Sequence, residues 1–190
     1  TYDRSLADFV EEAKTKTVTP FKLNKFVPPV DCAENIRHLY DWQEVFSGDS
    51  FIFDYPLMWD CCREYGGIIL AKTIYNDIRA LKSLNLNGYI SCQLQRNFFP
   101  TGFPMYVMAT ALADESRSYE DIKNEYFSAA FGIHGSEVYD ILSDVSSWKI
   151  YDYMRGNIET NSPEMRDAAG AIKLKIKAYS ERIAEMEREN

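Results

Sequence analysis

A single carboxylate, Asp54, stands at the end of a short aromatic run and is the first candidate for chemistry in this chain. Residues 51–55 read Phe-Ile-Phe-Asp-Tyr, which predicts a β-strand because aromatic and β-branched residues favour strands. Pro56 ends the predicted strand, since proline has no N–H to donate to a sheet. Tyr55 and Trp59 add aromatic side chains at this strand end. A carboxylate and aromatic side chains thus gather at a strand end, which is where parallel α/β sheets bind ligands, but these residues do not by themselves name a reaction.

Two further candidates, Gln93 and Phe98, follow a second predicted strand over residues 88–93. Residues 68–84 lie between the strands and repeat apolar side chains every three or four positions, which predicts a helix. Strand, helix and strand in this order form a βαβ unit, whose strands are parallel and whose carboxyl ends bind ligands. We therefore expect one concavity to gather five substrate-binding side chains: Asp54, Tyr55, Trp59, Gln93 and Phe98.

Each of these residues also has a purely structural interpretation. Asp54 could accept hydrogen bonds from backbone N–H groups in the turn after the strand, and Gln93 could cap a loop. Aromatic side chains lie more often in a core than in a site. Trp59 and Phe98 are the aromatic residues that fall in predicted loops, so they are the stronger candidates for ligand contact.

Composition excludes several classes of function. The 190 residues carry a net charge of -8, which argues against nucleic acid as a partner, because phosphates are bound by clustered Lys and Arg. No apolar run approaches the ~20 residues of a membrane span, so we expect no membrane association. The chain begins with Thr1 and not with Met, and from this we expect a processed or excised piece of a longer protein.

The four cysteines do not show the spacing of a zinc site, and Cys61 and Cys62 are adjacent and so pair poorly with each other. We expect reduced cysteines and a cytoplasmic protein. His38 and His134 have no neighbouring ligand residue at metal-binding spacing, and Gly66-Gly67 lacks the lysine of a phosphate-binding loop. The sequence therefore predicts neither a metal nor a cofactor.

The second half of the chain is predicted to be helical throughout. Ser118 and Ser162 are N-caps for two of its helices, and Pro163 suits the first turn of the last one. Apolar residues from Met165 to Met186 alternate spacings of four and three, which is a heptad pattern. This helix could dock onto its own domain or pair with a partner helix. We expect two regions, a β/α region over 1–115 and a helical region over 116–190.

The order of residues resembles a bacterial family of unknown function that is grouped with the glycoside hydrolases. It is distantly related to the family 20 β-hexosaminidases and to the α-glucuronidases. The resemblance covers about residues 34–145 and rests on Trp42 in a helix followed by three segments: FIFDYPLMWD, GYISCQ and FFPTGFPMYVMATALADESRSYEDIKNEYFSAAFG. It is a similarity of order and spacing without one sharp motif.

This resemblance implies an α/β fold, the last β/α units of a (β/α)8 (TIM-like) barrel followed by a helical tail. It implies a carbohydrate ligand but no catalytic acid in this piece, because the Asp-Glu pair of the hexosaminidase relatives would precede Thr1. Asp114-Glu115 falls between two predicted helices and fits a solvated helix end. The expected function is sugar contact without activity in isolation, together with self-association through exposed strand edges or the last helix. The alternative is a self-contained module that binds a partner protein through its helical half.

Overall fold

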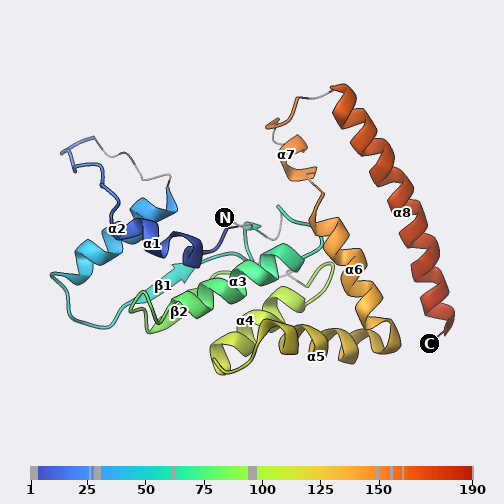
Figure 1. Ribbon diagram of the computed structural model, residues 1–190, viewed down its shortest axis with the longest axis horizontal. Helices are drawn as coiled ribbons and strands as arrows, with labels where there is room; N and C mark the ends of the chain where they lie inside the picture. Colours follow the sequence, from blue (N-terminus) through green and yellow to red (C-terminus); the bar gives the residue numbers. More distant parts are fainter. Residues whose placement is uncertain are drawn as a thin grey trace.

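The computed structural model describes residues 4–25, 27, 31–60, 63–93, 98–148, 150–154, 156–159 and 161–189. Helices predominate, and the described strands form one small sheet beside them (Figure 1). The elements in chain order are η1 (Leu6–Phe9), α1 (Val10–Ala13), α2 (Cys32–Gln43), β1 (Phe51–Asp54), α3 (Ile68–Ala80), β2 (Gly88–Ser91), α4 (Phe103–Ala113), α5 (Tyr119–Phe131), η3 (Gly132–His134), α6 (Gly135–Ser146), α7 (Ile150–Met154) and α8 (Pro163–Glu189).

The sheet has two parallel strands joined through α3, which confirms the predicted βαβ unit. Phe51 lies opposite Gly88, and Asp54 lies opposite Ser91. Residues opposite each other in a parallel pair point to the same side, so the register decides which side chains share a face. Both strands end at one edge of the sheet.

The expected fragment of a (β/α)8 barrel is wrong. The described residues contain one two-stranded sheet, and the chain is mostly helical. Periodicity identified one β/α unit correctly, but a barrel needs a ring of such units, and no local pattern reports ring closure. After β2 the chain continues through α4, α5 and α6, which pack beside α3 and on one another and do not return to the sheet.

The two faces of the sheet have different surroundings. Ile52 and Tyr89 are half-buried against apolar side chains of the helices. On the other face Phe51, Phe53 and Ile90 are exposed, with Phe53 58% accessible to solvent. Strand alternation thus gives one covered face and one bare apolar face.

The amino end of α3 is held by a buried carboxylate. Glu64 accepts hydrogen bonds from the backbone N–H groups of Gly66 at 2.7 Å, Gly67 at 2.8 Å and Leu70 at 3.2 Å. The hydroxyl of Ser146 accepts a fourth, from Ile68, at 3.1 Å. These acceptors satisfy N–H groups that have no partner within the helix. Because Ser146 ends α6, the same contact fixes α6 against α3.

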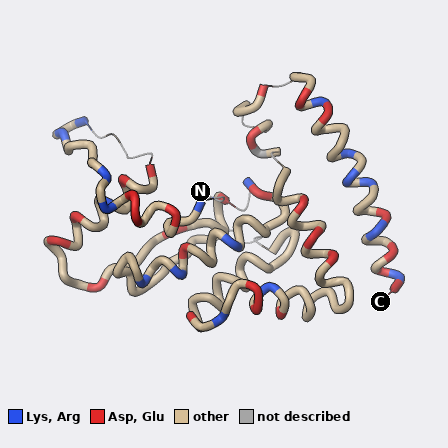
Figure 2. Tube along the Cα trace, viewed as in Figure 1, with Lys and Arg blue, Asp and Glu red and all other residues tan. Residues whose placement is uncertain are grey.

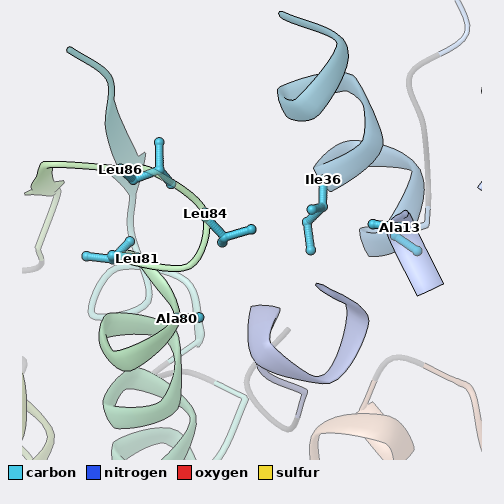
Figure 3. Close-up of a cluster of buried hydrophobic side chains, with 7 residues drawn as sticks. Ala13, Ile36, Ala80, Leu81, Leu84 and Leu86 are labelled. Atoms are coloured by element: carbon cyan, nitrogen blue, oxygen red, sulfur yellow. The ribbon is translucent and has the colours of Figure 1, made fainter. Parts of the chain in front are cut away.

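Three apolar clusters meet along α3. The first joins α1 and α2 to the segment after α3, with Ile36 facing Leu84 and Ala80 (Figure 3). The second joins α3 and α4 to the turn after β1 and includes Leu57, Ile74 and Met108. The third gathers residues of α3, α4 and α5: Ile68, Ala71, Phe103, Val107, Tyr119, Ile122 and Phe127. Helix α3 therefore contributes buried side chains to every cluster.

The predicted helices of the second half are present. Ser118 accepts from the N–H of Asp121 and Ser162 from that of Met165, as their assignment as N-caps requires. Helix α7 was not predicted, and α8 lies at one end of the molecule beyond α6 (Figure 1). In the described part of the chain, no helix combines the length and the apolar character needed to cross a bilayer.

Candidate functional site

The carboxyl ends of β1 and β2 bring the sequence-predicted residues to one edge of the sheet. The N–H of Cys92 donates to the carbonyl of Asp54 at 3.1 Å, so Gln93 follows directly beyond the end of β1. The predicted common edge is confirmed by this pairing. Neither of the two pockets described below is lined by these residues, so a shared concavity stays a prediction.

Asp54 is half-buried and faces the helix-covered side of the sheet. Its carboxylate accepts from the N–H of Tyr55 at 2.8 Å and from the hydroxyl of Tyr89 at 3.3 Å. The first bond is the turn contact expected from the structural interpretation. The second links Asp54 to the neighbouring strand, so the carboxylate is oriented from two sides.

Tyr55 and Trp59 are the ends of one turn, and two residues between them are buried. The N–H of Trp59 donates to the carbonyl of Tyr55 at 3.2 Å, and Pro56 and Leu57 within this turn are buried. Tyr55 is exposed, and 56% of Trp59 is accessible to solvent. The rings of Phe53 and Tyr55 lie 5.7 Å apart in an edge-to-face arrangement. The turn therefore presents aromatic side chains to solvent at the end of β1.

Gln93 and Phe98 are both exposed. The ring of Phe98 lies against Gly102 at the start of α4, where a Cβ atom would overlap the ring. Among the described ring contacts, none joins Phe98 to Tyr55 or to Trp59. The structure thus brings Asp54, Tyr55 and Trp59 together through the backbone and places Phe98 at the start of a helix.

Sequence reasoning missed a second carboxylate, Asp77 of α3. It accepts from the hydroxyl of Ser5 at 2.7 Å and from the N–H of Leu6 at 2.6 Å. Burial raises the pKa of Asp77 to about 6, and the negative charge of Asp54 adds to the increase. A signal was available, because Asp77 lies on the apolar stripe of α3 between Ile74 and Ile78.

Tyr89 connects the two carboxylates electrostatically. Burial raises the pKa of the Tyr89 phenol, and the charges of Asp54 and Asp77 raise it further. Beside Asp54, the hydroxyl of Ser91 is buried and has no hydrogen-bond partner among the described residues. The covered face of the sheet thus carries a polar cluster, Asp54, Tyr89, Ser91 and Asp77, between the strands and α3.

This arrangement suits binding better than acid–base chemistry. One carboxylate oxygen of half-buried Asp77 accepts from both Ser5 and Leu6, which ties this carboxyl group to the amino-terminal segment, and its charge acts on Tyr89. Two carboxyl groups would have to flank a scissile bond for glycoside hydrolysis. The described residues contain no cluster of three or more His, Cys, Asp or Glu side chains that could hold a metal ion.

Two hollows lie away from the sheet edge. The smaller, of about 400 Å³, lies along α3 and is lined in part by Ser5, Lys72 and Tyr119. The Lys72 ammonium lies 4.2 Å from the centre of the Tyr119 ring. A larger, apolar groove of about 760 Å³ lies between α7 and the first half of α8.

Comparison of the chain with known protein families, with curated proteins and with solved structures finds no match. The resemblance to the glycoside hydrolase-like family therefore stays a hypothesis.

Proposed function

We propose that the chain binds carbohydrate at the carboxyl ends of β1 and β2. The observation that carries the proposal is the pairing of solvent-exposed Tyr55 and Trp59 with the oriented carboxylate of Asp54. A flat aromatic ring accepts the apolar face of a sugar, and a fixed carboxylate accepts hydrogen bonds from its hydroxyl groups. Gln93 and Phe98 would contact the ligand from the β2 side.

Glycan-array screening followed by titration calorimetry with the best oligosaccharide tests this proposal. Trp59→Ala should weaken binding about 10-fold, a loss of about 1.4 kcal/mol. Trp42→Ala is the matched control, because Trp42 has the same 56% exposure but lies on α2, which precedes the amino end of β1. Equal affinity for the wild type and the Trp59 variant would refute sugar stacking at this turn.

We expect the chain to bind carbohydrate without hydrolysing it. The chain should not turn over a panel of aryl glycosides, because the carboxyl group of Asp77 is half-buried and hydrogen-bonded to the amino-terminal segment. Turnover that is lost in Asp54→Asn would make Asp54 a catalytic residue and would contradict this expectation.

We infer a cytoplasmic location from the cysteines, since a reducing compartment keeps thiols free. The free thiols of Cys32 and Cys92 support the inference, whereas Cys61 and Cys62 lie outside the described residues. Thiol titration of the protein purified without reductant tests it. Four reactive thiols after denaturation are expected.

A second candidate function, a module that binds another protein chain, is favoured by the exposed apolar side of α8 and by the groove beside it.

A further inference from the structure

Helix α8 keeps one side attached to the molecule and leaves another side bare. Its attached side reaches α6, where Lys175 and Tyr179 bind Asp144 at 2.6 and 2.8 Å. Arg182 binds Glu137 at 2.7 Å. These contacts are polar, and Met186 is the one residue of α8 that is buried.

The bare side is a continuous stripe. Seven residues spaced by three and four positions are all exposed: Arg166, Ala169, Lys173, Ile176, Ser180, Ile183 and Glu187. Such spacing places them on one face of a helix, over a length of about 32 Å. Ile176 is 51% and Ile183 45% accessible, so the apolar centre of the stripe lies open to solvent. We call these residues the α8 stripe.

Charge is distributed unevenly along α8 (Figure 2). Between residues 166 and 177 there are four basic residues and one acidic one. Between residues 181 and 189 there are four acidic residues and two basic ones. When two copies of α8 run in opposite directions, the basic half of each helix therefore lies beside the acidic half of the other and attracts it.

We propose that two copies of the chain associate through antiparallel pairing of their α8 stripes. A twofold axis beside Ile176 would place Arg166 of each copy next to Glu187 of the other. The same axis brings Ala169 opposite Ile183 and Ile176 opposite itself. Parallel pairing would set Arg166 against Arg166 and Glu187 against Glu187, so like charges oppose that arrangement.

The groove beside α8 provides the remaining surface. Nine residues of α8 line it, and four of them belong to the α8 stripe, namely Arg166, Ala169, Lys173 and Ile176. Trp148, Ile150 and Tyr153 contribute apolar side chains to its other side. In the antiparallel pair, the acidic half of the second α8 enters this groove, where Ile183 meets an apolar floor and Glu187 meets a basic rim.

Sedimentation equilibrium of the full chain at moderate salt tests the pairing. We expect a species of twice the 22.0 kDa chain mass. Ile176→Glu should raise the dimer dissociation constant at least ~10-fold, because it places a charge at the centre of both stripes. Leu174→Glu is the control, since Leu174 is 71% exposed but lies outside the stripe, and it should leave the constant unchanged.

Charge reversal tests the direction of the pairing. Arg166→Glu and Glu187→Arg should each weaken the dimer several-fold, and the double variant should return to within ~3-fold of the wild-type constant. Circular dichroism of each variant reports whether α8 remains helical. The proposal is overturned by a monomer at ~100 μM wild-type protein. It is also overturned by a dimer that Ile176→Glu does not weaken, or by a double variant no tighter than the single ones.

Discussion

Burial raises the pKa of Asp77, so its contribution to the free energy of unfolding changes with pH in the direction opposite to that of most acidic groups. Its pKa of about 6 in the folded chain lies above 3.8, the ordinary value expected in the unfolded chain. Between these values the folded state binds more protons than the unfolded state, so this residue raises the free energy of unfolding as the pH falls from above 6 towards 4. The effect is on the order of 2 kcal/mol.

Asp77→Asn should remove this dependence, since an amide oxygen can still accept from Ser5 and Leu6 but carries no charge. We expect the variant to be more stable than the wild type above pH 7, with the difference vanishing near pH 4. Urea unfolding across this range measures it. Asp140→Asn, an exposed position on α6, is the control. A constant difference between variant and wild type at all pH values would contradict the raised pKa.

The start of α3 shows how one side chain positions a whole element. Glu64→Ala would leave three buried N–H groups without their acceptor, and each such group costs about 1–3 kcal/mol. Allowing for water entry, we expect a loss of about 3 kcal/mol in the free energy of unfolding, and a smaller loss for Glu64→Gln.

Glu164→Ala is the matched control for Glu64, because Glu164 is an acidic residue in the first turn of α8 but is exposed. Its loss should cost below about 0.5 kcal/mol. Chemical denaturation compares the two variants. Equal effects would mean that Glu64 is only a helix-dipole contact and not the cap of α3.

Local patterns predicted the elements well and their assembly badly. Alternation in residues 51–55 and helical spacing from Ile68 indicated β1 and α3, because both signals depend on neighbours in the sequence. That Phe51 and Phe53 lie on the exposed face could not be predicted, since the same alternation fits a strand that is covered on either face. The barrel was implied by the family resemblance, and the described residues contain one two-stranded sheet in its place.

The candidate site was predicted to a similar extent. The strand end that carries Asp54 and precedes Trp59 was predicted because a strand end can be recognised from its sequence, whereas ligand binding by these two residues stays a prediction. Asp77 was missed because its partners, Ser5 and Leu6, lie more than 70 positions away, and contacts at that separation leave no periodic trace. Its place on an apolar stripe was the one local clue.

At the scale of the whole molecule, α3 and α8 differ in how much of each helix is buried. Helix α3 is buried in three clusters, so its exchange with solvent should require global unfolding. Helix α8 is held by Asp144, by the pair of Glu137 with Arg182, and by Met186. Few buried contacts imply local opening at low free energy.

Hydrogen exchange followed by mass spectrometry, at a protein concentration low enough to disfavour pairing, should show α8 exchanging faster than α3. Asp144→Ala removes the acceptor of Lys175, Tyr179 and Trp148, so exchange in α8 should increase while exchange in α3 stays the same. Asp140→Ala, on the same helix but exposed, should change neither. If α3 and α8 accelerated together in the Asp144 variant, the two helices would belong to one cooperative unit, and α8 would be part of the core that α3 organises.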